Sequence, residues 1–85
     1  MKKLTITIIK DISQEDPQIE ANMVLADFIA GVHAQGGQII SQSVSVSDIE
    51  LIVELFLETE TTEFSLSTQR VTDERYTISA LEEII

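Results

Sequence analysis

The sequence predicts an α+β fold in which one long helix packs on a mainly antiparallel sheet. Segment 3–9 alternates apolar residues with threonine, a period of two that is typical of a strand. Segment 17–35 is mostly apolar, starts at an Asp-Pro pair and stops at a Gly-Gly pair, which is typical of a helix. We therefore expect β-α-β-β-β order with a short C-terminal strand or helix. A chain of 85 residues supplies a core for one domain, here residues 1–85.

The first two elements carry clear boundary signals. Asp11 to Asp16 is polar and predicts a loop after the first strand. Asp16 suits the helix N-cap, and Pro17 suits the first helical position, where its missing N–H is harmless. Gly36 suits a left-handed residue after the last turn. The apolar stripe comprises Ile19, Met23, Ala26 and Ala30 beside Val24, Leu25, Phe28, Ile29 and Val32.

Two further strands and an ambiguous tail follow the helix. Segment 38–46 predicts a strand with Ile40, Val44 and Val46 on one face and Ser41, Ser43 and Ser45 on the other. Segment 63–68 also alternates and predicts a strand. In the tail, residues 75–79 fit a short strand before a final helical turn capped by Ser79 and Glu82. Alternatively, Thr72 caps a helix that runs to Ile85.

Residues 48–60 fit two structures. As a strand, the segment has one wholly apolar face, and the other face carries Glu50, Glu54 and Glu58 with Ile52 and Phe56 between them. As a helix, it has an apolar stripe, and Ser47 with Glu50 forms a capping box. The helix would stack the three glutamates at i, i+4 spacing and put acids at its negative end, and both effects are unfavourable. We therefore favour the strand.

The distribution of charge is uneven. The formal net charge is −10, and no Lys or Arg lies between Asp11 and Gln69. All five bases lie near the ends of the chain: Lys2, Lys3, Lys10, Arg70 and Arg75. The electrostatic field of such an acidic chain repels nucleic acid and anionic lipid and attracts basic surfaces. We expect no direct binding to nucleic acid or membrane. The alternative is that the acids serve solubility alone.

Little in the sequence indicates chemistry. His33 is the only histidine and fits a cation at a helix C-terminus. The acids Asp11, Glu15, Asp16 and Glu20 lack the spacing of a calcium loop, and the serines at 41–47 have no neighbouring His and acid to activate them. Gly36-Gly37 is not followed by a phosphate-loop motif. We expect no enzyme, no metal and no cofactor.

The chain has no Cys, and its N-terminal apolar run is too short for a signal peptide, so we expect a cytoplasmic protein.

The β-α-β-β opening corresponds to half of a ferredoxin-like domain. Residues 4–11 (LTITIIKD) and 26–41 (ADFIAGVHAQGGQIIS) resemble an ACT regulatory domain, and the resemblance covers about residues 3–58. Members of that family commonly dimerise and bind amino acids at the interface, which here directs attention to Asp11–Pro17. The chain lacks the family's glycine-containing turn after the first strand, and no second long helix is evident after Thr59.

The leading functional hypothesis is a small acidic binding protein whose partner has a basic surface. An inhibitor that imitates nucleic-acid charge, of the anti-restriction, anti-CRISPR or immunity type, would have such a partner, for example a nucleic-acid-binding protein. Carboxylates about 7 Å apart on a strand, or about 6 Å apart on a helix, would suit this role. The alternatives are a ligand-sensing homodimer of ACT type and a structural subunit that pairs through strand edges. The candidate partner-binding residues are Glu50, Ile52, Glu54, Phe56, Glu58, Glu60 and Glu63.

Overall fold

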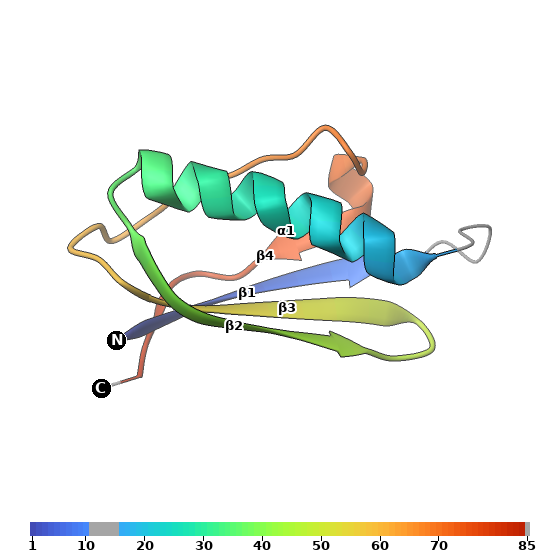
Figure 1. Cartoon of the computed structure of the whole chain (residues 1–85), viewed down its shortest axis with the longest axis horizontal. Coiled ribbons are helices and arrows are strands. Elements are labelled where there is room, and N and C mark those ends of the chain that lie inside the picture. The colour runs from blue at the N-terminus through green and yellow to red at the C-terminus, as the bar shows by residue number, and fades with distance from the viewer. Residues whose placement is uncertain (11–15, 85) are drawn as a thin grey trace.

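One helix packs on one face of an antiparallel sheet in the computed structural model of the chain (Figure 1). The structure describes residues 1–10 and 16–84. The elements are β1 (Lys2–Ile9), α1 (Pro17–Ala34), β2 (Gln38–Val46), β3 (Glu50–Glu58), a 3₁₀ turn η1 (Asp73–Arg75), β4 (Tyr76–Ile78) and β5 (Glu82–Glu83). This confirms the predicted α+β class. Residues 11–15 of the predicted loop at 11–16, which are also most of the segment where an ACT-type ligand would bind, lie outside the described residues.

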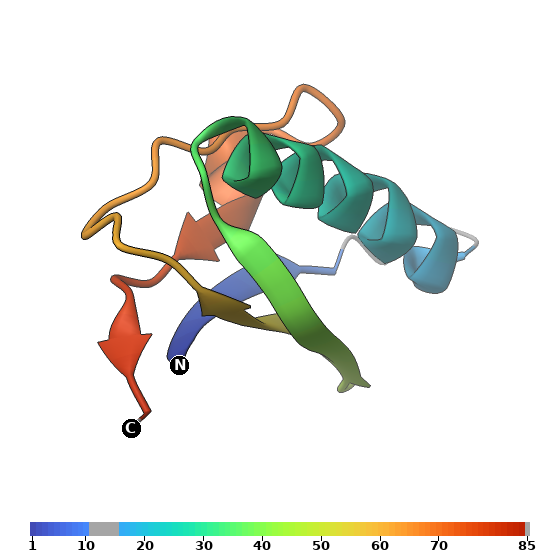
Figure 2. The ribbon, with the colours of Figure 1, turned by 60° about the vertical axis from the view of Figure 1, so that its left-hand side comes forward.

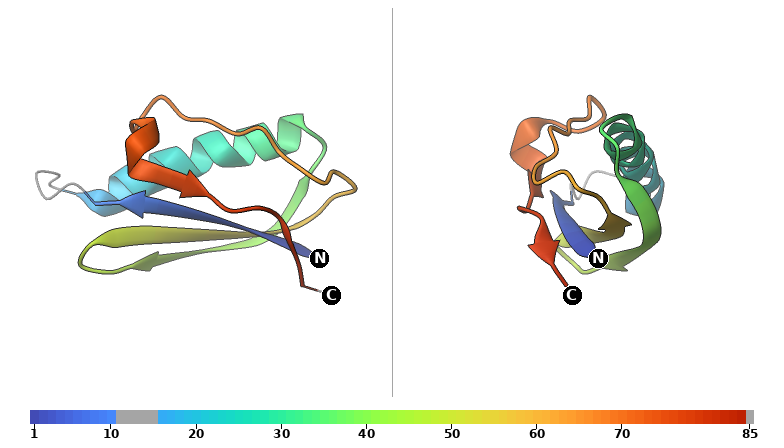
Figure 3. Two further views of the ribbon diagram at one scale, coloured as in Figure 1. Left: turned by 180° about the vertical axis from the view of Figure 1, so that it is seen from behind. Right: turned by 90° about the vertical axis from the view of Figure 1, so that its left-hand side faces the viewer.

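The sheet has the order β2-β3-β1-β4, and β5 pairs with the start of β1. All of these pairings are antiparallel. The helix connects β1 to β2 with β3 inserted between them, which is a split β-α-β arrangement. Figure 2 shows the twist of the sheet, and Figure 3 shows β2 at one margin and β5 at the other.

The helix boundaries follow the sequence signals closely. The carboxylate of Asp16 accepts from the backbone N–H groups of Gln18 and Ile19, which confirms it as the N-cap. Gly36 has φ +91°, the left-handed conformation expected just after the last turn. The helix ends at Ala34, one residue before the predicted end.

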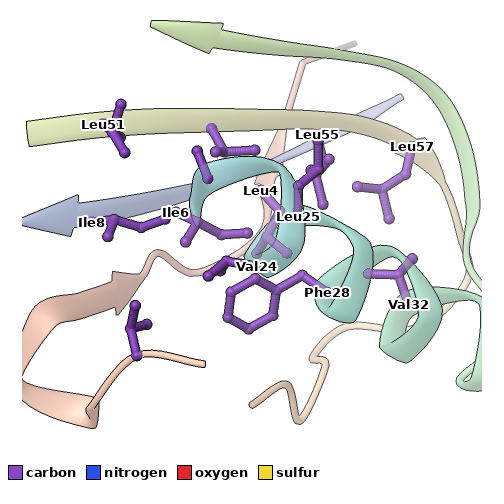
Figure 4. Packing of buried hydrophobic residues seen from close by; sticks show 13 residues of the cluster. Leu4, Ile6, Ile8, Val24, Leu25, Phe28, Val32, Leu51, Leu55 and Leu57 are labelled. Carbon is purple, nitrogen blue, oxygen red and sulfur yellow. The ribbon is translucent and has the colours of Figure 1, made fainter. Parts of the chain in front are cut away.

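The core forms where α1 meets the inner face of β1 and β3. β1 contributes the alternate residues 4, 6 and 8, and β3 contributes 51, 53, 55 and 57. Figure 4 labels six of these side chains, which lie on the side of the two strands that faces Phe28 and its neighbours on the helix: Leu4, Ile6, Ile8, Leu51, Leu55 and Leu57. The fully buried or nearly buried residues are Leu4, Ile6, Ile8, Ala21, Val24, Leu25, Phe28, Val32, Leu51, Val53, Leu55, Leu57 and Val71.

The stripe predicted on the helix is only partly buried. Val24, Leu25, Phe28 and Val32 enter the core, but Ile19 and Met23 are 55% and 47% exposed. Ala26 and Ala30 are exposed as well. The helix is apolar around most of its circumference, so the sequence pattern does not identify which side faces the sheet.

The second strand has the predicted bounds but a different side-chain register at its start. A β-bulge at Ile40 shifts the alternation by one residue, so Ile39, not Ile40, packs against the core. Ile40 is 52% exposed. Val44 packs against the core as predicted, and Val46 lies on the same face but is 54% exposed.

The segment after β3 contradicts two predictions. Residues 63–68 do not form a strand; they are irregular, and Phe64 and Leu66 pack against the core. This segment runs along the helix side of the sheet (Figure 3). In the tail, the short strand is confirmed as β4, but neither the final helical turn nor the helix from Thr72 to Ile85 forms. Instead, β5 pairs with β1.

Phe28 is the largest fully buried side chain and meets Tyr76 edge-on, with ring centroids 5.6 Å apart. Phe28→Ala should lower the free energy of unfolding by about 3–5 kcal/mol, since it removes this contact and leaves a cavity. Ile19→Ala on the exposed side of the same helix should change it by less than about 1 kcal/mol. Urea denaturation of the two variants checks this, and equal losses would contradict the assigned orientation of the helix.

Candidate protein-binding face

The face of the sheet opposite α1 has no helix over it (Figure 1). We call it the open sheet face. It exists because β3 alternates strictly: its odd-numbered residues from Leu51 to Leu57 are fully buried, which turns the even-numbered ones to the other side. Residues directly opposite in the ladder share a face, so the register assigns the neighbours. The open sheet face comprises Lys3, Thr5, Thr7 and Ile9 of β1, Ser41, Ser43 and Ser45 of β2, and Glu50, Ile52, Glu54, Phe56 and Glu58 of β3.

Two apolar side chains lie in the middle strand of this face. Ile52 is flanked across the ladder by Thr7 and Ser45. Phe56 is flanked in the same way by Lys3 and Ser41. Both are only partly buried, although they lie on the central part of the sheet. Each is therefore an apolar patch bordered by hydroxyl groups and charges.

Cations from the ends of the chain partly neutralise the glutamates of this face. Lys3 Nζ lies 3.5 Å from a carboxylate oxygen of Glu54 and 3.9 Å from one of Glu82 on β5. The amino group of Met1 lies 3.6 Å from Glu58. Within residues 1–10 and 16–84, Glu50 has no ion-pair partner within 4 Å. The pairs are partly exposed and weak, so the carboxylates stay accessible to a partner.

Lys10 follows β1 and contacts the β2–β3 turn. Its Nζ donates to the backbone carbonyl of Ser47 in the β2–β3 turn (2.8 Å). The acids around the open sheet face (Glu50, Glu54, Glu58 and Glu82) outnumber the two cations that pair with them, Lys3 and the Met1 amino group.

Two predicted site residues, Glu60 and Glu63, lie outside the open sheet face. The strand ends at Glu58, and the chain then turns towards the C-terminal end of the helix. There the Gln35 side chain donates to the Ser65 carbonyl (2.8 Å) and accepts from the Ser65 N–H (2.9 Å). Glu63, with Phe64 and Leu66, borders a surface hollow on that side of the sheet. The structure therefore brings five of the seven predicted residues together.

The other described acids of the base-free span are dispersed. Arg75 donates to Glu20 through Nη1 (2.7 Å), and Arg70 Nε donates to Asp27 (3.1 Å). Asp16 caps the helix, and Asp48 lies in the β2–β3 turn. The span lacks bases along the sequence, but the fold brings the terminal bases to it. Within residues 1–10 and 16–84, the acids therefore do not form one continuous surface.

Sequence reasoning did not identify the contributions of β1 to this face. Lys3, Thr5, Thr7 and Ile9 lie there because β1 pairs with β3 over eight residues. The alternation of residues 3–9 indicates two faces, but only the register shows that Ile9, 54% exposed, aligns with Glu50. The pairing of Lys3 with Glu54 likewise requires the fold.

The other candidate sites show no assembled chemistry. His33 is exposed in the last turn of α1. Among the described residues, no group of three or more His, Cys, Asp or Glu side chains could hold a metal ion. The same part of the chain contains no helix that is both long and apolar enough to cross a membrane. Asp11 and Glu15 lie outside it, so the absence of a metal stays a prediction.

No family model, no curated protein and no solved structure matches this chain. The resemblance to ACT domains therefore stays a hypothesis. The described part has the split β-α-β topology, but residues 59–72 form no second helix.

Replacing Glu50, Glu54 and Glu58 together by Gln should change the free energy of unfolding by less than about 1 kcal/mol. Their ion pairs are partly exposed, and such pairs contribute about 0–1 kcal/mol. Thermal and urea denaturation of the triple variant measure this. A loss above about 2 kcal/mol would show that the carboxylates hold the sheet together and are not available to a partner.

Proposed function

We propose that the chain is a small non-enzymatic binding protein whose open sheet face engages a basic surface of another protein. The observation that carries the proposal is the alternation on β3, which places Ile52 and Phe56 between Glu50, Glu54 and Glu58 on a face that the helix leaves uncovered.

The apolar pair would supply most of the affinity. Protein interfaces are commonly centred on a few apolar or aromatic anchors bordered by polar groups that exclude water. Phe56 and Ile52 are four positions apart on one strand, so their Cα atoms lie about 13 Å apart on the same face, with Glu54 between them. The border of serines and threonines is uncharged and can hydrogen-bond to a partner. This arrangement fits a partner with two apolar patches, one for each anchor, that are separated and flanked by Lys or Arg.

The carboxylates would supply orientation and rate. The whole chain has a formal net charge of −10, which attracts a basic partner over long range. Close to the face, Glu50 is available directly, whereas Glu54 and Glu58 would exchange their weak internal pairs for pairs with the partner. Binding should therefore weaken as salt rises.

The spacing of the glutamates on β3 gives no support to the hypothesis that the face imitates the charges of a nucleic-acid backbone. Glu50, Glu54 and Glu58 are four positions apart on a strand, which spaces their Cα atoms by about 13 Å. Duplex DNA carries one charge per about 1.7 Å of its axis. The spacing of about 7 Å expected between Glu58 and Glu60 is not formed on a strand, because β3 ends at Glu58. The proposal therefore concerns a basic protein surface in general.

The ligand-sensing alternative depends on other parts of the chain. A hollow of about 510 Å³ borders Phe64, Leu66, Ile78 and Leu81, but within the described residues it presents no buried charged group to fix an amino acid. We therefore do not favour this alternative. Thermal-shift measurements with amino acids would support it if any of them raised the melting temperature.

The charge contribution is tested with two variants of equal net charge. In the first, Glu50, Glu54 and Glu58 become Gln; in the second, the exposed Glu60, Glu63 and Glu83 become Gln. Each of the immobilised proteins captures partners from a lysate of the native source, and quantitative mass spectrometry compares the captured proteins with those of the parent. The first variant should lose a basic protein that the second retains, because the effect depends on position and not on total charge.

Equal retention by both variants would show that these three carboxylates do not contribute to binding. Equal loss from both would show that only total charge matters. Either result would contradict the assignment of the charge to this face.

The apolar contribution has its own test. Phe56→Ala should weaken binding of the captured partner by about 30-fold or more, the loss expected for a central aromatic anchor. Met23→Ala removes a similar apolar side chain, 47% exposed, from the opposite side of the molecule and should leave affinity unchanged. Isothermal titration calorimetry gives both affinities. A change below twofold for Phe56→Ala in a folded variant would exclude it as an anchor.

A further inference from the structure

The β2 strand forms an edge of the sheet and lacks most of the features that usually protect an edge strand from pairing with another chain. It runs for nine residues, Gln38–Val46, and pairs only with β3 among the described residues. Its sequence, QIISQSVSV, contains no charged residue and no proline, although 24% of the chain is charged. Natural edge strands are usually protected by Lys, Pro, bulges or short length. Here the only such device is the bulge at Ile40, which leaves 41–46 regular and unprotected.

We propose that β2 pairs antiparallel with β2 of a second copy of this chain, about a two-fold axis near Ser43, to form one continuous sheet across the dimer. The unpaired backbone donors and acceptors of an edge match those of an extended strand, which is therefore the expected occupant. The choice of a second copy rests on charge and on side-chain matching.

Charge favours this edge over other surfaces for self-association. Two chains of net charge −10 repel each other, and they can approach most closely where neither carries charge. Within the strand pair no acid faces another. The closest acidic strand, β3, lies one strand inward in each copy. The two β3 strands would then be about 14 Å apart, which exceeds the Debye length of about 8 Å at physiological salt.

The side chains of β2 are compatible with a partner of the same sequence. An axis at Ser43 places Ser41 opposite the partner's Ser45 on the open sheet face and Gln42 opposite the partner's Val44 on the helix face. The exposed Ile40 and Val46, 52% and 54% exposed, become cross-strand neighbours. The turn residue Asp48 approaches the uncharged Gln38. Over residues 40–46, the pairing therefore matches serine with serine and apolar with apolar, brings no like charges together, and leaves only Gln42 opposite Val44 as an unmatched pair.

The other margin of the sheet is less suited to pairing with a strand of a second copy. It consists of β4 and β5, which have three and two residues. β5 consists of Glu82 and Glu83, so two copies that met there would bring like charges together. The dimer we infer leaves the open sheet face uncovered. The dimer and the proposed partner complex are therefore independent, and either can be wrong while the other is right.

The chain has no cysteine, so single cysteines report contacts cleanly. Ser41→Cys, Ser43→Cys and Ser45→Cys are compared under mild oxidation with Ser67→Cys, which is exposed in the irregular segment. In an antiparallel homodimer only a residue near the axis faces itself. One β2 variant, expected to be Ser43→Cys, should therefore form covalent dimers at least about tenfold faster than Ser67→Cys.

Light scattering of the unmodified chain on size exclusion should give twice the monomer mass of 9.5 kDa. Raising NaCl from 50 to 500 mM should strengthen this dimer, since screening reduces repulsion between like-charged copies. The proposed partner complex should weaken over the same range, which distinguishes the two associations. A monomer at about 1 mM protein, or a dimer in which no β2 cysteine links faster than Ser67→Cys, would overturn the proposal.

Discussion

The structure depends on the position of β3 at the centre of the sheet with one wholly apolar face. Four of its side chains, at 51, 53, 55 and 57, are completely buried against β1 and α1. A shift of one residue in the register would bring glutamates into the core, at a cost far greater than any gain elsewhere. This constraint fixes the pairing of β1 and β2 on either side. It also places the glutamates, with Ile52 and Phe56, on the opposite face.

The sequence predicted the parts of the fold that depend on local pattern. The N-cap at Asp16, the left-handed Gly36 and the alternation of β1 and β3 are each encoded within a few residues, and all are present in the structure. The stacked glutamates favoured the strand over the helix for 48–60, and β3 confirms that choice. The failures concern features that depend on distant residues. Segment 63–68 alternates like a strand but packs on the core without joining the sheet, and the bulge at Ile40 has no distinct local signal.

In the candidate site, too, the features encoded locally were predicted and those that depend on distant residues were not. Five of the predicted residues share a face because one strand carries them. Glu60 and Glu63 do not, because the strand ends and the Gln35 side chain holds the following segment at the helix end. The apparent acidic field was also a property of the linear sequence. Arg70, Arg75 and Lys3 are distant from it along the chain but reach Asp27, Glu20 and Glu54 in the fold.

Methyl NMR of the isoleucine-labelled chain, recorded with and without the captured partner, tests the central claim most directly. The Ile52 and Ile9 signals, on the open sheet face, should shift or broaden on binding, whereas Ile19 and Ile29 on the helix should stay unchanged. The opposite pattern, with perturbation confined to the helix methyls, would contradict the account.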